Sequence, residues 1–189
     1  MKIYKYIIGL LTACILFSLT ACSSPAETKS EELQPSETSE TEVSESVDDA
    51  LTDGSGVIVA YFSATGNTRS IAESIADITG GELYEIVPSE PYTAEDLDYG
   101  NSQSRSSLEM GDPSSRPEIG SAELSLDDCS TLYLGYPIWH GQAPRIMDTF
   151  VETYDFDGIT VIPFCTSGGS GVGSSAENLA ALAGSGKWL

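Results

Sequence analysis

The sequence predicts an α/β domain built on a doubly wound, five-stranded parallel sheet. Short apolar runs bounded by Gly or Ser recur along the chain from about residue 56, and amphipathic helical segments lie between them. A continuous apolar run of five or six residues suits a strand that is buried on both faces. Strands that alternate with helices are typical of a parallel sheet with right-handed crossovers.

The expected strands begin with Val57–Phe62, which follows Gly56 and ends before Ser63. Further strands are expected at 83–87, 131–136 and 159–165, and residues 187–189 resemble the opening of a fifth. Because these runs are apolar throughout, we expect helices on both faces of the sheet.

Three segments have helical periodicity, at 68–78, 145–154 and 174–182. Ile71, Ile75 and Ile78 recur at spacings of four and three, which predicts that they share the buried face of the first helix. In the second helix, Ile146, Phe150 and Val151 fall on one face in the same way.

Residues 88–125 interrupt this alternation with a stretch rich in Ser, Pro, Asp and Glu, called the excursion below. Loops of this length in compact domains are often functional. We expect a short helix near Ala94–Asp98. The other notable side chains of the excursion, which a lid could use, are Tyr92, Tyr99, Arg105 and Arg116.

The charge balance is strongly acidic over the 189 residues, with 8 Lys and Arg against 29 Asp and Glu and a formal net charge of −21. This composition argues against nucleic-acid binding, which needs clustered basic side chains. An acidic surface favours solubility and steers cationic partners.

The first residues predict a lipoprotein signal peptide at 1–21. Lys2 and Lys5 precede an apolar run at 6–19, which is short for a bilayer span. Leu19-Thr20-Ala21-Cys22 resembles a lipobox, so Cys22 is the expected lipidation site. An uncleaved membrane anchor is the alternative. Lipidation at this site predicts an extracytoplasmic protein that its lipid anchors to the bacterial cell membrane.

Residues 22–54 are rich in Ser, Thr, Glu and Pro. Such a segment buries too little apolar surface to offset its ordering entropy, so we expect a disordered acidic tether. The folded domain is then expected at 55–189.

Ser63-Ala64-Thr65-Gly66-Asn67-Thr68 lies between the first strand and the first helix. The free N–H groups of a helix N-terminus favour a phosphate, and the three hydroxyls add uncharged donors. No Lys follows as in a P-loop, so a single terminal phosphate is the expected ligand group. A well-capped helix without a ligand is the alternative.

Two more loops leave strands at the same edge of the sheet, where ligands of open parallel sheets bind. Pro137-Ile138-Trp139-His140-Gly141 offers an aromatic ring, and Thr166-Ser167-Gly168-Gly169-Ser170-Gly171 offers close backbone approach. Together with the phosphate loop, they predict a site for a planar phosphorylated cofactor.

These motifs resemble the flavodoxin family, and several of them agree in order. Tyr61–Thr68 is similar to its phosphate signature, and similar strings occur at 135–139, 143–145, 163–171 and within 88–117. The resemblance implies strand order 2-1-3-4-5 and a bound flavin mononucleotide (FMN), with 63–68 at the phosphate and the other two loops beside the isoalloxazine. The candidate cofactor-binding residues are Ser63, Ala64, Thr65, Gly66, Asn67, Thr68, Pro137, Ile138, Trp139, His140, Gly141, Thr166, Ser167, Gly168, Gly169 and Gly171.

Two features depart from that family pattern. His140 stands where a second aromatic residue is common. A protonated imidazole near the flavin would raise the reduction potential of the flavin, and a solvent-facing loop residue without such a role is the alternative. The sequence also stops at Leu189, so we expect the C-terminal strand and helix to be incomplete in it.

Three other patterns in the sequence do not support a functional site or a disulfide. Residues 171–176 match the dinucleotide fingerprint, but they follow the fourth strand and lack a downstream acidic partner. His140 has no neighbouring ligand for a metal. Cys129 and Cys165 are expected at opposite ends of their strands, beyond disulfide reach, so both are expected to be free thiols.

The leading functional hypothesis is an FMN-dependent electron carrier that serves an unknown redox partner protein at the outer face of the membrane. An NAD(P)H-dependent flavin or quinone reductase is the main alternative, since the fold serves both. A module that binds a partner or a small anion without flavin is the third. No catalytic residue is expected for the carrier.

Overall fold

The computed structural model describes residues 56–189. The predicted signal peptide, the lipidation site at Cys22 and the whole acidic tether at 22–54 lie outside the described residues. In chain order, the elements are β1 (Val57–Tyr61), α1 (Asn67–Thr79), β2 (Glu82–Glu85), α2 (Arg105–Gly111), β3 (Thr131–Pro137), α3 (Arg145–Thr153), β4 (Thr160–Thr166), α4 (Ser175–Ala183) and β5 (Lys187–Trp188).

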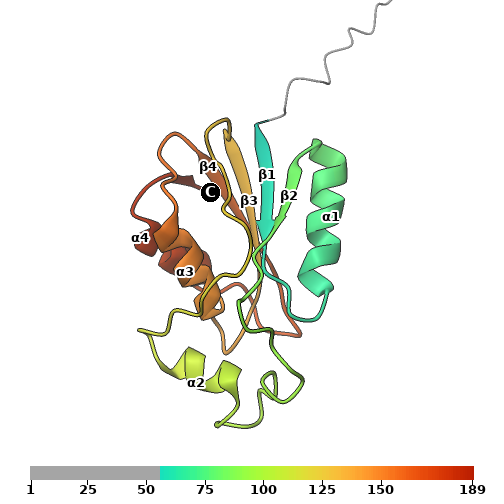
Figure 1. Ribbon diagram of the computed structural model, residues 1–189, viewed down its shortest axis with the longest axis vertical. Coiled ribbons are helices and arrows are strands. Elements are labelled where there is room, and N and C mark those ends of the chain that lie inside the picture. The colour runs from blue at the N-terminus through green and yellow to red at the C-terminus, as the bar shows by residue number, and fades with distance from the viewer. Residues whose placement is uncertain (1–55) are drawn as a thin grey trace, which may run out of the picture. The chain divides into compact units, whose positions relative to one another are not determined.

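The sheet has five strands in the order β2-β1-β3-β4-β5, and every pairing is parallel. In register, Ile58 lies beside Leu132, Leu132 beside Val161, and Val161 beside Trp188. The predicted fold class and strand order are therefore confirmed. Figure 1 shows α1 on one side of the sheet and α3 and α4 on the other.

The larger core lies between the sheet and helices α3 and α4. Leu132, Leu134 and Val161 on the strands are fully buried there with Ile146 and Phe150 of α3. The predicted face of this helix is confirmed, and Val151 is buried as well. Truncation of a buried aromatic or aliphatic side chain of this kind to alanine typically costs about 2–5 kcal/mol of stability.

The predicted buried face of α1 is only partly confirmed. Ile75 is partly buried and packs against the core on this side, but Ile71 is 46% exposed and Ile78 84% exposed. The buried residues of the helix are Thr68, Ala72 and Ala76. The small side chains let the helix approach the sheet closely, and the large groups on this side come from the strands, such as Tyr61. Isoleucine spacing therefore marked a face of α1 that is largely exposed.

The predicted helix at Ala94–Asp98 is also wrong. Thr93 and Asp96 form a turn there, in which the Asp96 carboxylate accepts hydrogen bonds from the backbone N–H and hydroxyl of Thr93. The helix of the excursion is α2, which begins after Ser104, whose Oγ accepts from the N–H of Ser107. Side-chain acceptors of this type compete with helical hydrogen bonds and favour turns and N-caps.

Cys129 precedes β3, and Cys165 lies near the end of β4, where both are free thiols. Burial raises the pKa of both thiols, so they are mostly protonated at neutral pH. Within residues 56–189, no helix is long and apolar enough to cross a membrane.

Candidate functional site

The carboxyl ends of β1, β3 and β4 surround an open cavity of about 310 Å³. Figure 1 shows that this edge of the sheet faces the part of the excursion that carries α2. The lining residues of the cavity are Thr65, Asn67, Tyr99, Pro137, Ile138, Trp139, His140, Thr166, Ser167 and Gly168. All except Tyr99 belong to the set predicted from the sequence. The remaining predicted residues lie outside this lining: Thr68 is in the first turn of α1, and Ser63, Ala64, Gly66, Gly141, Gly169 and Gly171 are in the same three loops.

The loop after β1 turns sharply into α1. Gly66 has φ 88°, a left-handed conformation that favours glycine, and its N–H donates to Ser63 Oγ at 3.1 Å. The first helical N–H groups have no acceptor within the helix. Among the helices of residues 56–189, only α1 has neither a side-chain cap nor an acidic residue in its first turn. Its N-terminus therefore suits an external anion.

Thr68 ties this loop to the loop after β4. Its side chain is 1% exposed, and its hydroxyl lies 2.8 Å from Thr166 Oγ1. Thr65, by contrast, is exposed, and its Oγ1 accepts from Asn67 Nδ2 at 3.2 Å. The exposed hydroxyl is thus the one available to a ligand without a change in the loop.

The loop after β3 is a two-residue hairpin turn. Trp139 and Gln142 exchange two backbone hydrogen bonds of 2.9 Å, and the two central residues have positive φ, 46° at His140 and 81° at Gly141. This is the pattern of a type I′ turn. Within residues 56–189, His140 is the only non-glycine residue with positive φ. The turn holds the imidazole at the rim of the cavity, where Nε2 lies 3.4 Å from Ser107 Oγ.

Trp139 is 2% exposed and packs into a group of aromatic rings. The ring of Phe62 is 5.5 Å away and the ring of Tyr92 is 5.1 Å away, both edge-on. The ring of Tyr99 also lies beside the indole, with the two ring centroids 6.0 Å apart. Although Trp139 contributes to the cavity lining, most of its indole is packed against protein.

Charged side chains hold the excursion over these rings. Glu109 of α2 accepts from Tyr92 Oη at 2.6 Å and from Arg105 Nε at 2.7 Å, and the Arg105 guanidinium lies 4.1 Å from the centre of the Tyr92 ring. Burial and the bond to Glu109 raise the pKa of Tyr92. From α3, Arg145 donates to the backbone carbonyls of Glu109 and Met110.

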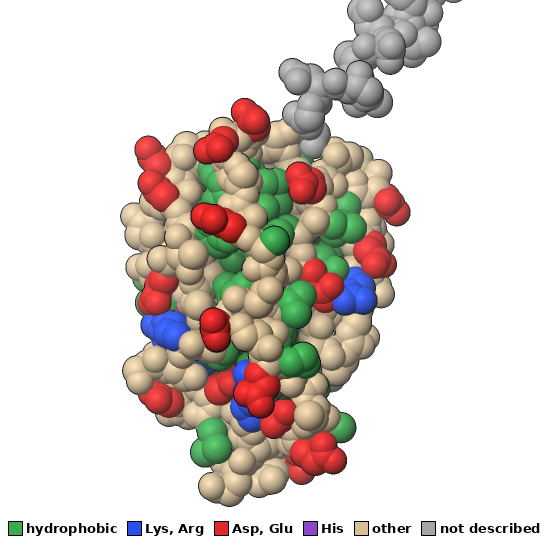
Figure 2. Space-filling view, viewed as in Figure 1, with side chains coloured by type: hydrophobic (Ala, Val, Ile, Leu, Met, Phe, Trp, Pro, Cys, Tyr) green, Lys and Arg blue, Asp and Glu red, His purple; other side chains and the backbone are tan. Residues whose placement is uncertain are grey.

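The cavity itself is lined by no Asp, Glu, Lys or Arg. Every arginine of residues 56–189 is engaged by a carboxylate: Arg69 by Glu85, Arg105 by Glu109, Arg116 by Asp148 and Glu152, and Arg145 by Asp148. Figure 2 shows acidic side chains spread over one face of the domain, with few basic ones. The site therefore offers neutral donors within a negatively charged domain.

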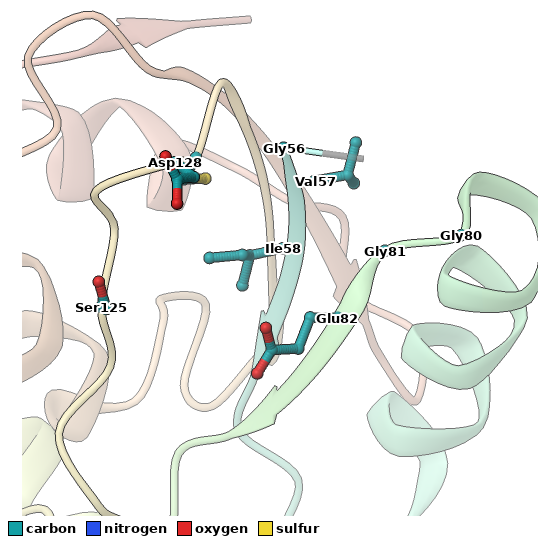
Figure 3. Close-up of a pocket in the computed structure, with 9 residues that line it drawn as sticks. Gly56, Val57, Ile58, Gly80, Gly81, Glu82, Ser125 and Asp128 are labelled. Carbon is teal, nitrogen blue, oxygen red and sulfur yellow. The ribbon is translucent and has the colours of Figure 1, made fainter. Parts of the chain in front are cut away.

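A second cavity, of about 400 Å³, lies at the opposite edge of the sheet, near the start of β1. Glu82 and Asp128 contribute carboxylates to its lining, beside Cys129. In Figure 3, the side chain of Ile58 points between the strand and the segment that carries Ser125 and Asp128. The two carboxylates that line this second cavity disfavour the binding of an anion. Residues 56–189 also contain no cluster of three potential metal ligands.

Tyr99 was expected from the sequence among the side chains that a lid could use, but it was not placed among the cofactor-binding residues. An aromatic side chain in a polar stretch was the only signal. No spacing rule indicates that residue 99 folds back over the loops that follow β1 and β3.

Comparison with known proteins gives the class of this chain. Residues 56–189 match the family model described as Flavodoxin, and the chain therefore belongs to the flavodoxin family. Two crystal structures of proteins assigned as flavoproteins, from Bacteroides eggerthii and Bacteroides uniformis, are each 47% identical to it. Each match covers 70% of this chain; it covers 84% of the first protein with a TM-score of 0.67, and 85% of the second with 0.68.

A flavoprotein from Lactobacillus acidophilus, crystallised in complex with FMN, shares the fold at 22% identity and a TM-score of 0.58. That match covers 70% of this chain and 89% of the other. A comparison with curated proteins gave no match.

Proposed function

We propose that this chain binds FMN and transfers electrons at the outer face of a bacterial cytoplasmic membrane, to which a lipid on Cys22 anchors it. The observation that carries the proposal is the cavity at the carboxyl edge, where an uncapped helix N-terminus adjoins a neutral, aromatic-lined space. Membership of the flavodoxin family supports the same ligand, as does the FMN bound by the relative from Lactobacillus acidophilus.

The residues present fit this cofactor. Ser63–Thr68 would hold the phosphate through N–H groups and hydroxyls, and the cavity between the loops after β3 and β4 would hold the ring. Its volume of about 310 Å³ falls at the lower end of the usual range for ligand sites. When bound, FMN supplies the redox chemistry, and the protein supplies binding, orientation and electrostatics.

The acidic domain should set a low reduction potential. An electron added at the cavity meets the field of many carboxylates, and the arginines that could oppose it are already paired. Salt screens such fields over about 8–10 Å, so the potential should rise with ionic strength.

Parallel reductive titrations of the FMN-loaded protein with dithionite and with NADPH separate a carrier from a reductase. We expect dithionite to reduce the flavin in resolved one-electron steps and NADPH to leave it oxidised. Rapid bleaching by NADPH, in a single two-electron step, would contradict the carrier and favour the NAD(P)H-dependent flavin or quinone reductase. A protein that never acquires the visible absorption of flavin would instead be a binding module of another kind.

The anchor is tested separately by mass spectrometry of the membrane fraction. We expect a mature N-terminus at Cys22 that carries the mass of acyl chains, because a lipobox follows a short apolar segment. Cys22→Ala should abolish the acyl mass, whereas Cys14→Ala, at the other cysteine of the first 22 residues, should leave it in place. An unacylated, soluble chain with another N-terminus would exclude the proposed anchor.

A further inference from the structure

Tyr99 is the one cavity-lining residue that comes from outside the three strand-end loops. Its side chain is 49% exposed, although it borders the same space as Thr65, His140 and Thr166. Among the described residues, its hydroxyl has no hydrogen-bond partner, and its ring contacts only those of Trp139 and His140, each with centroids 6.0 Å away. The phenol is therefore free to present a face to the cavity.

Trp139 cannot serve the same role without rearrangement. Phe62 and Tyr92 pack against its indole, which is 2% exposed. Tyr92 is fixed in turn by its hydrogen bond to Glu109 and by the guanidinium of Arg105. A planar ligand that enters this cavity meets the ring of Tyr99 before it meets the face of the indole.

The backbone of the excursion presents Tyr99 at the tip of a tight turn. The N–H of Asn101 donates to the carbonyl of Asp98 at 3.0 Å, and the Asp98 carboxylate accepts from the N–H of Gly100 at 3.0 Å. Ser104, the cap of α2, donates to the carbonyl of Asn101 through both its N–H and its hydroxyl. The turn is thus coupled to a helix that Arg145 holds against the domain.

We propose that Tyr99 is the aromatic residue against which the flavin ring stacks, and that the excursion between β2 and β3 positions it there. This inference rests on the proposed FMN site. Aromatic rings prefer offset-stacked or edge-to-face contacts, and such pairs add stabilisation beyond the area that they bury. In this arrangement, Trp139 packs against the ring of Tyr99, and the small exposed part of the indole contacts the ligand.

The test titrates the flavin-free full chain with FMN and follows flavin fluorescence, which a stacked phenol quenches. Tyr99→Leu should weaken binding roughly tenfold and leave the bound flavin more fluorescent at saturation. Tyr99→Phe keeps the ring and should match the wild type in affinity, but it lacks the phenol, so the bound flavin should be more fluorescent than in the wild type. Leu108→Ala, which alters an exposed residue of α2 outside the cavity lining, is the matched control and should change neither.

The outcomes separate this inference from the proposed function. If the wild-type chain does not bind FMN, the proposed function fails, and the inference fails with it. If the wild type binds FMN, and the folded Tyr99→Leu variant shows the same affinity and quenching, the stacking role of Tyr99 alone is overturned. Circular dichroism and thermal melting establish that the variant is folded, and Tyr99→Ala provides a second truncation of the ring.

Discussion

Riboflavin is expected to bind this chain roughly a thousandfold more weakly than FMN, because the two ligands differ only in the phosphate. The proposed phosphate site offers the free N–H groups of the first turn of α1 and the exposed hydroxyl of Thr65. Hydrogen bonds to charged groups contribute about 1.5–3 kcal/mol each, so two or three of them account for a difference of this size. Competitive titration of the flavin-free protein measures it directly.

Single substitutions measure how much individual hydroxyl groups contribute to the preference for FMN over riboflavin. Thr65→Val removes one exposed hydroxyl and should weaken FMN binding about 10- to 100-fold while it leaves riboflavin affinity unchanged. Ser74→Ala removes a hydroxyl further along α1 that bonds only to the carbonyl of Ser70, so it should change neither affinity. Equal affinities of the wild type for riboflavin and FMN would show that Ser63–Thr68 does not hold a phosphate.

The sequence contains enough information for the sheet and for the position of the cavity. Apolar runs such as Val57–Phe62 favour buried strands, because they are shorter than an ordinary helix and are bounded by residues such as Gly56 and Ser63. Right-handed crossovers then bring the carboxyl ends of β1, β3 and β4 to one edge. The Ser-, Gly- and Trp-containing loops that follow these strands therefore had to meet there, as they do.

Side-chain packing was harder to predict from the sequence, because periodicity shows which residues share a face but not how closely two elements approach each other. Ala72 and Ala76 face the sheet in α1 because Tyr61 and its neighbours already fill the space between them. In the excursion, hydrogen bonds accepted by the side chains of Asp96 and Ser104 decide where the turn ends and α2 begins. Such bonds link specific side chains and leave little periodic trace in the sequence.

Arg145→Met is expected to destabilise the domain by about 3 kcal/mol at neutral pH, because removal of one partner leaves a buried charge. Asp148 is 4% exposed, and its Oδ2 lies 3.0 Å from Arg145 Nη1 and 3.8 Å from Arg116 Nη1. Arg116 remains as a weaker partner, which keeps the loss near the lower end of the usual range. Arg145 also donates to two carbonyls of α2, so its loss should loosen the segment that carries Tyr99.

The loss of stability caused by Arg145→Met should become smaller as the pH falls. Burial raises the pKa of Asp148, while Arg145 and Arg116 lower it, and removal of Arg145 should raise it further. A raised folded-state pKa means that the native state holds this proton more tightly than the unfolded chain. The resulting stabilisation is present below the usual aspartate pKa of about 3.9 and disappears as the pH rises through the raised value. The variant should therefore approach the wild type when the pH falls from neutral through that raised pKa.

Urea unfolding at several pH values, for Arg145→Met, Asp148→Asn and the double variant, measures both effects. The double variant should be more stable than the sum of the single losses predicts, by about 0.5–3 kcal/mol, since an asparagine in place of Asp148 leaves no unpaired charge. Arg69→Met is the matched control. Its ion pair with Glu85 is exposed, and loss of such a pair costs at most about 1 kcal/mol. If Arg145→Met were no more damaging than Arg69→Met, or its effect did not depend on pH, the buried charge of Asp148 would not be what Arg145 stabilises.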